Sequence, residues 1–80
     1  MPAEDAEATR MVRAQITRRY VDSSQLDVRV IHGTVYLRGV LRPLRTHRDI
    51  DLQKEMETIS HILRQKPGIR EVVWEATIRG

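Results

Sequence analysis

Apolar and polar residues alternate on both sides of His32-Gly33, across residues 26–40, in a pattern typical of a β-hairpin. A two-residue turn at this point requires positive φ at both positions, which Gly adopts freely and His tolerates better than most residues. One face of the hairpin is then apolar, and a shift by one residue would bury charged side chains. The predicted pairs are Ile31 with Thr34, Val30 with Val35, Arg29 with Tyr36, Val28 with Leu37, Asp27 with Arg38 and Leu26 with Gly39. On the polar face we expect Asp27 to pair with Arg38, and Arg29 to lie beside the ring of Tyr36.

Two segments show the spacing of amphipathic helices. The first is expected from Asp5 to about Tyr20, after a disordered lead of residues 1–4. Its apolar positions are Ala8, Met11, Val12, Ile16 and Tyr20. The second ends at Lys66, before Pro67-Gly68, and Thr46 or Asp49 can cap its start. Its apolar positions are Leu52, Met56, Ile59, Ile62 and Leu63, with Lys54, Glu57, His61 and Gln65 on the polar side.

A third strand is predicted in the final alternating run, residues 69–78. Val72, Trp74, Ala76 and Ile78 fall on one side of it, and Val73, Glu75 and Thr77 on the other. Asp22, Ser23 and Ser24 are expected to connect the first helix to the hairpin. The segment after Val40 has no periodicity and contains Pro43, which cannot donate to a sheet, so a loop of about eight residues is expected.

These elements predict an α+β fold with the order αββαβ, in one domain covering residues 5–80. Both helices would cover the same face of a three-stranded mixed sheet, in a two-layer sandwich. We expect the first hairpin strand in the middle, antiparallel to the final strand, which gives the strand order 2-1-3. The second helix would provide a right-handed crossover to the final strand.

The pattern resembles the BON domain family, small bacterial αββαβ modules, over residues 9–78. The resemblance lies in Val28, Val30, Gly33, Thr34, Val35, Leu37 and Gly39, and in Pro67, Gly68, Ile69, Val72, Val73, Ala76, Thr77 and Ile78. It implies a module that contacts phospholipid, protein or small ligands, often in the cell envelope, and it implies no catalytic activity. The chain departs from the family in a longer stretch between Gly39 and Gly68, and in Trp74, where a small polar residue is common.

Composition narrows the classes of partner. The 80 residues carry 14 basic and 11 acidic side chains, a formal charge of +3 that favours weak contact with anionic surfaces. The chain has no cysteine, so disulfides and thiolate metal sites are excluded. No apolar run approaches the roughly 18 residues of a membrane helix. The N-terminal residues are acidic where a secretory signal is basic, and we therefore expect a cytoplasmic protein.

Neither catalysis nor cofactor binding is favoured by the polar residues. His32, His47 and His61 belong to a turn, a loop and the polar side of a helix, without a second ligand at metal-binding spacing. Asp49 and Asp51 diverge near a helix start, where they complement the helix dipole. No nucleophile motif and no glycine-rich phosphate loop is present. The sequence thus predicts a binding module without metal or cofactor.

Two surfaces are candidates for binding. The polar face of the sheet is predicted to contact protein, a partner or a second copy, through Arg29, Ile31, Thr34, Tyr36 and Val73. The alternative is contact with anionic phospholipid through the loop of residues 38–48, with Arg38, Arg42, Arg45 and Arg48 as the contacts. Nonspecific nucleic-acid binding is a weaker alternative, because single-strand recognition uses several aromatic rings on neighbouring strands and Tyr36 stands alone.

Overall fold

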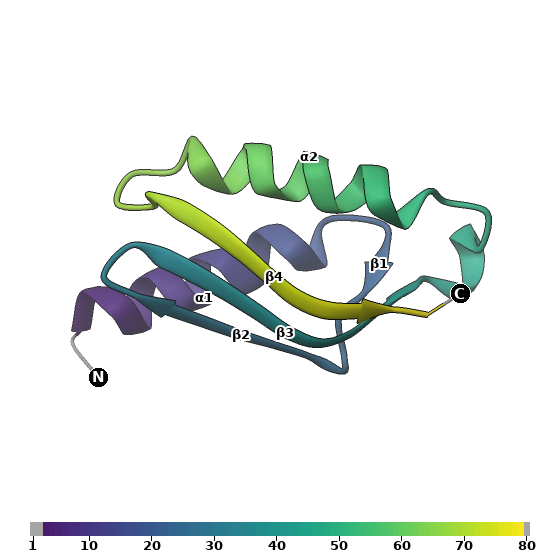
Figure 1. The fold of residues 1–80 in the computed structure, drawn as a ribbon, viewed down its shortest axis with the longest axis horizontal. Coiled ribbons are helices and arrows are strands. Elements are labelled where there is room, and N and C mark those ends of the chain that lie inside the picture. Colours follow the sequence, from purple (N-terminus) through teal and green to yellow (C-terminus); the bar gives the residue numbers. More distant parts are fainter. Residues whose placement is uncertain (1–2, 80) are drawn as a thin grey trace.

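The computed structural model describes residues 3–79 (Figure 1). The helices are α1 (Ala3–Thr17) and α2 (Leu52–Arg64), with a short 3-10 helix at Arg45–His47. The strands are β1 (Val21–Asp22), β2 (Leu26–Ile31), β3 (Thr34–Pro43) and β4 (Glu71–Ile78). The predicted α+β class and the order of the main elements are therefore confirmed, with β1 as an additional short strand.

The sheet is built around β3. β1 and β2 pair with it antiparallel, and β4 pairs with it in parallel, so that Val35 lies beside Val72 and Leu41 beside Ile78. The predicted strand order 2-1-3 is wrong, because the second hairpin strand, β3, is central and the final strand, β4, pairs with it rather than with β2. Backbone bonds from Arg70 N and Glu71 N to the carbonyl oxygen of Gly33, at 2.8 and 3.4 Å, bring β4 to the β3 side of the hairpin.

The helix α1 covers the outer edge of β2, and this is a second reason why β4 pairs with β3 and not with β2. The Thr9 hydroxyl accepts a hydrogen bond from Val30 N at 3.2 Å, and the Asp5 carboxylate accepts one from His32 N at 3.2 Å. Side chains of a helix thus satisfy N–H groups that a neighbouring strand would otherwise bind. No further strand can pair there without displacing α1.

The hairpin has the predicted turn and register. His32 and Gly33 have φ angles of 49° and 84°, and all six predicted pairs from Ile31–Thr34 to Leu26–Gly39 are present. Burial in β2 alternates as predicted, with its even-numbered residues buried and its odd-numbered residues exposed. Local turn chemistry and period-two burial therefore fixed this part of the fold.

The segment after Val40 corrects the sequence prediction. β3 continues to Pro43, where it pairs with β1 as Val21–Pro43 and Asp22–Arg42, and a 3-10 helix follows. Proline is tolerated because it lies at the last position of the strand, and the next residue, Leu44, donates to the carbonyl oxygen of Tyr20 at 3.5 Å. The predicted irregular loop is therefore replaced largely by strand and helical turn.

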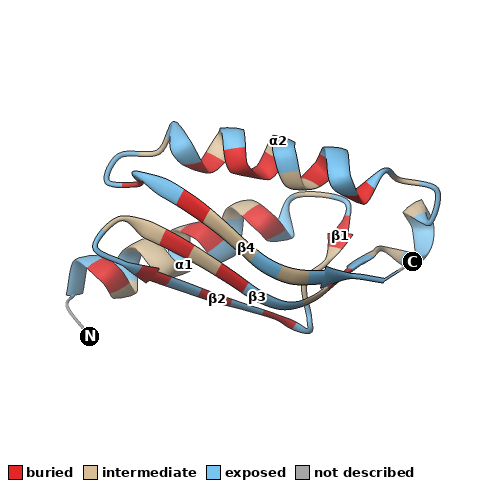
Figure 2. Cartoon of the chain, viewed as in Figure 1, coloured by how far each residue is buried: buried red, intermediate tan, exposed pale blue. Residues whose placement is uncertain are grey.

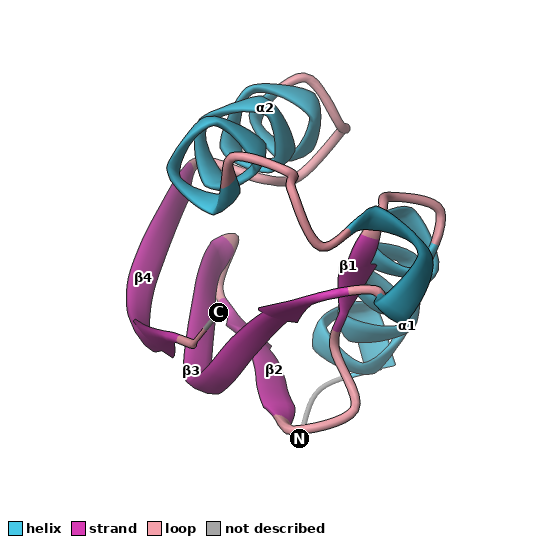
Figure 3. Cartoon of the chain, turned by 90° about the vertical axis from the view of Figure 1, so that its right-hand side faces the viewer, coloured by secondary structure: helices cyan, strands magenta, loops and turns pink. Residues whose placement is uncertain are grey.

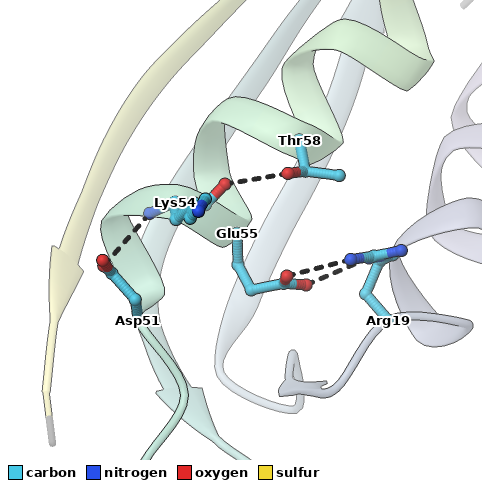
Figure 4. Close-up of polar contacts among 5 residues, drawn as sticks. All are labelled: Arg19, Asp51, Lys54, Glu55 and Thr58. Atoms are coloured by element: carbon cyan, nitrogen blue, oxygen red, sulfur yellow. Dashed lines mark hydrogen bonds and ion pairs between the residues drawn. The ribbon is translucent and has the colours of Figure 1, made fainter.

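Both helices differ from the prediction at their ends. α1 begins at Ala3, within the expected lead, and ends at Thr17 rather than Tyr20; Met1 and Pro2 of that lead lie outside the described residues. α2 ends at Arg64 rather than Lys66. Its cap is neither Thr46 nor Asp49 but Asp51, whose carboxylate accepts from Lys54 N at 3.2 Å (Figure 4).

One hydrophobic core joins the helices to the sheet (Figure 2). Val12 and Ile16 of α1, Ile59 and Leu63 of α2, and Leu37 of β3 are at most 2% exposed. Beside this core, Arg19 donates two hydrogen bonds to the Glu55 carboxylate at 3.0 and 2.9 Å, linking the end of α1 to α2 (Figure 4). That charge-assisted bond raises the pKa of Arg19 above its ordinary value. Neither described helix combines the length and apolar character needed to cross a membrane.

Candidate functional site

The five residues predicted to contact protein lie on three adjacent strands. The register places Arg29 of β2 beside Tyr36 of β3, and Tyr36 beside Val73 of β4, in one row across the sheet. Ile31 and Thr34 form the neighbouring row, next to the turn. Ile31 is 46% exposed, whereas Thr34, Tyr36 and Val73 are half-buried. We call this set of five residues the Tyr36 face.

Charged residues form the next row of the same face. Arg38 lies between Asp27 of β2 and Glu75 of β4 in the register, and all three are exposed. The Asp27 carboxylate lies 3.5 Å from Arg29 Nε and 4.0 Å from an Arg13 nitrogen, and its predicted ion pair with Arg38 is not among the ion pairs of the described residues. Arg29 therefore contacts a carboxylate on its own strand. The Tyr36 face is thus a partly apolar surface bordered by charge.

The predicted phospholipid residues divide into two groups. Arg38 lies on the sheet among the charged row described above. Arg42, Arg45 and Arg48 line a hollow of about 360 Å³ at the C-terminal end of β3. Asp22 and Pro43 complete its lining. We call this site the arginine hollow: Asp22, Arg42, Pro43, Arg45 and Arg48. Pairing of β1 with the end of β3 and the 3-10 helix after Pro43 bring these residues together.

Asp22 is the member of this site that sequence reasoning missed. Its carboxylate accepts a hydrogen bond from Ser24 N at 3.0 Å. Hydrogen bonds from Ser24, with a smaller contribution from the positive charges of Arg42 and Arg45, lower the pKa of Asp22 below its ordinary value. The hollow therefore holds a carboxylate that offsets part of its positive charge. Only the long-range pairing of β1 with β3 places it there, so no local pattern indicated it.

Tyr20 and His47, which are near the residues of the arginine hollow in the sequence, form an aromatic pair. Tyr20 was predicted as the last apolar position of the first helix, but it lies beyond α1, is 51% exposed and stacks on the His47 ring with centroids 4.3 Å apart. His47 also lies 2.9 Å from the Thr46 hydroxyl through its Nδ1 atom. The pair holds the 3-10 helix against the segment that precedes β1.

The remaining histidines lie apart from this pair. His32 is in the hairpin turn, and His61 of α2 contacts Gln65, the C-cap residue of that helix, at 3.1 Å. Within residues 3–79, no group of three or more histidine, aspartate or glutamate side chains is arranged to hold a metal ion.

Comparisons with protein-family models, with curated proteins and with solved structures give no match. Function is therefore inferred from the Tyr36 face and the arginine hollow. The first is a partly apolar surface on three adjacent strands, and the second is a hollow lined by three arginines, a proline and a carboxylate.

Proposed function

We propose that the chain is a non-catalytic, BON-like binding module that contacts protein through the Tyr36 face. In this proposal both helices cover one face of the sheet, as in a two-layer sandwich, and the opposite face stays open for a partner. The observation that carries it is the row formed by Arg29, Tyr36 and Val73, which are register neighbours on three adjacent strands. Tyrosine and arginine are the residues that most often contribute strongly to protein interfaces.

The pattern of burial supports an open face. Along β2 and the first part of β3, residues that point to the core are nearly inaccessible, with Val30 at 1% and Val35 and Leu37 at 0% exposure. Their neighbours in sequence, which point the other way, are exposed or half-buried. Ile31, at 46% exposure, adds apolar area that a partner would remove from water.

The test compares two tyrosine variants that carry the same change. Tyr36→Glu places a charge in the centre of the proposed contact, and Tyr20→Glu changes an exposed tyrosine outside it. Tagged wild type and both variants are crosslinked in extract of the source cells, and copurifying proteins other than copies of this chain are quantified by mass spectrometry. We expect the partner to be lost with Tyr36→Glu and retained with Tyr20→Glu, with unchanged circular dichroism. Equal recovery with both variants would contradict the proposal.

The arginine hollow supports a second candidate function, which is peripheral binding of anionic phospholipid. Three arginines around one hollow of about 360 Å³ provide several donors for a phosphate group. Co-sedimentation with phosphatidylglycerol vesicles tests it at low and raised salt. Changing Arg42, Arg45 and Arg48 to Ala is expected to abolish binding, and Asp22→Asn to strengthen it. A variant with Arg10, Arg18 and Lys54 changed to Ala, which loses the same charge from exposed positions outside the hollow, should retain most of the binding. Binding that weakens equally in both triple variants would contradict a specific site.

A further inference from the structure

The two outer edges of the sheet are treated differently. The edge of β2 is covered by α1 through Thr9 and Asp5, as described above. β4 pairs only with β3 among the described strands, and Figure 3 shows it at the border of the sheet with no element beyond it. β4 contains no proline and no lysine, two devices with which proteins protect an open edge. The β4 edge is therefore ready to accept another strand.

The groups that face outward on this edge follow from the bonds at its two ends. Glu71 N donates to Gly33 O and Arg79 N donates to Leu41 O, so the odd-numbered residues of β4 bond to β3. In a parallel strand the direction of the backbone groups alternates from one residue to the next. Trp74 and Ala76, with the other even-numbered residues, therefore present free N–H and C=O groups to the outside.

The charged residues of β4, together with Arg79, which follows it, favour one register for the antiparallel pairing of two copies across this edge. Placing Trp74 opposite Ala76 lets the outward groups bond to one another, and it sets Glu71 of each copy opposite Arg79 of the other. Opposite charges at cross-strand positions stabilise a pair of strands. A shift by two residues in one direction brings Glu71 opposite Thr77, and in the other direction it brings Arg79 opposite Val73. Neither shift forms the ion pair.

The same two-fold axis also suits α2. The indole N–H of Trp74 donates to the Ser60 hydroxyl at 2.6 Å, so the middle of α2 lies at the same level as the middle of β4. Two copies of α2 related by this axis would run antiparallel, so that the acidic Glu57 and the basic Arg64, which both lie beside Trp74, would run in opposite directions in the two copies. Between these charges lies a shallow hollow of about 280 Å³ that Met56 and Trp74 help to line. Apart from Glu75, which faces its own copy on the axis, the charged residues of helix and strand are thus complementary about one axis.

We propose that a second copy of this chain pairs antiparallel with the β4 edge, forming a homodimer with one continuous sheet. Glu71 and Arg79 form the outer ion pairs, Trp74 and Ala76 exchange backbone hydrogen bonds, and Met56 and Trp74 are covered between the two α2 helices. The Tyr36 faces of the two copies then lie on the same side of the joined sheet. This contact does not depend on the proposed function, because it uses the edge rather than the face of the sheet.

The test is a charge exchange followed by analytical ultracentrifugation over a wide concentration range. Glu71→Arg places two arginines opposite each other, twice per dimer by symmetry, and is expected to weaken dimerisation at least about tenfold. The double variant Glu71→Arg with Arg79→Glu restores opposite charges and is expected to regain the wild-type dimer. Glu7→Arg, an equal change of charge at an exposed position of α1, is the matched control and should dimerise as the wild type does.

A second measurement tests the register. Glu75 lies on the proposed axis opposite its own copy, so Glu75→Gln removes a like-charge contact and is expected to tighten the dimer. Amide hydrogen exchange at Trp74 and Ala76 should slow as the concentration of the chain rises. A wild-type monomer at all concentrations would overturn the proposal. A dimer that resists Glu71→Arg but is lost with Tyr36→Glu would also overturn it, and would assign self-association to the Tyr36 face.

Discussion

Individual polar side chains stabilise this small fold where backbone groups would otherwise lack partners. The Thr9 hydroxyl donates to the carbonyl oxygen of Asp5 at 2.8 Å and accepts from Val30 N, so one side chain joins α1 to the edge of β2. Within the described residues, every buried side-chain nitrogen or oxygen has a partner. A chain of this size has few contacts to spare, and such bonds therefore contribute noticeably to stability.

Thr9→Val keeps the shape of the side chain but removes the acceptor for Val30 N. We expect a loss of about 1 to 3 kcal/mol in the free energy of unfolding, because a half-buried N–H remains without a partner. Urea unfolding followed by circular dichroism measures it. Thr58→Val is the matched control, since its hydroxyl only bonds to Lys54 O within α2 at 3.0 Å (Figure 4), and should change stability by less than about 0.5 kcal/mol. Equal losses would assign the effect to threonine itself.

Asp22 makes the stability of the folded state depend on pH. Its pKa is lowered on folding from the ordinary value of 3.8, so its carboxylate stabilises the folded state above that value. This contribution is lost as pH falls through the lower pKa of the folded state. We therefore expect Asp22→Asn to be less stable than wild type at neutral pH, with a difference that disappears well below pH 3.8. A difference that persists in strong acid, measured by urea unfolding over a pH series, would contradict this role.

Among the elements, β3 organises the molecule because it pairs with all three other strands. Within β3, Gly39 has a φ angle of 109° and lies close to the Gln25 carbonyl. That carbonyl oxygen accepts a hydrogen bond from Val40 N at 3.0 Å. The turn before β4 uses another glycine, Gly68, with φ of 84°. Both have backbone angles that other residues rarely adopt, but their surroundings differ.

Gly39→Ala and Gly68→Ala separate backbone strain from crowding. A Cβ atom at Gly39 would clash with the Gln25 carbonyl oxygen, whereas one at Gly68 meets no atom within 4 Å. We expect losses of about 3 kcal/mol at Gly39 and about 1 kcal/mol at Gly68, since only the first adds a collision to the unfavourable φ. Thermal unfolding of both variants tests this order. The reverse order would show that the bend in β3 can relax.

The molecule as a whole depends on one small core shared by the helices and the sheet. Leu37, on the central strand, is fully buried within it, whereas Ile31 at the end of β2 is 46% exposed. A domain of this length has a total stability of roughly 4 to 12 kcal/mol. A single cavity near the centre can therefore remove a large part of it.

Leu37→Ala is expected to lower the free energy of unfolding by about 2 to 5 kcal/mol, because the core cannot close around the missing atoms. Ile31→Ala should change it by less than about 0.5 kcal/mol, since its side chain is largely in water. Denaturant unfolding measures both. The second variant also provides folded protein with a smaller Tyr36 face. If it unfolds as readily as the first, Ile31 belongs to the core and the face is smaller than proposed.

The hairpin, its register and, apart from Tyr20, the apolar sides of both helices could be derived from the chain alone. They depend on turn chemistry at His32-Gly33 and on local periodicity, which act over a few residues. The five residues of the Tyr36 face were placed together for the same reason, because alternation assigns each strand residue to one side.

Strand order, the continuation of β3, the arginine hollow and the open β4 edge required the folded structure. Each of these features depends on contacts between distant segments, and the alternation of β4 is equally compatible with a position beside β2 or beside β3. The choice was made by Thr9 and Asp5, which cover the edge of β2, and by Gly33, whose carbonyl oxygen binds the start of β4. Periodicity assigns a residue to a face, but only competition for backbone hydrogen bonds in space decides which strands become neighbours.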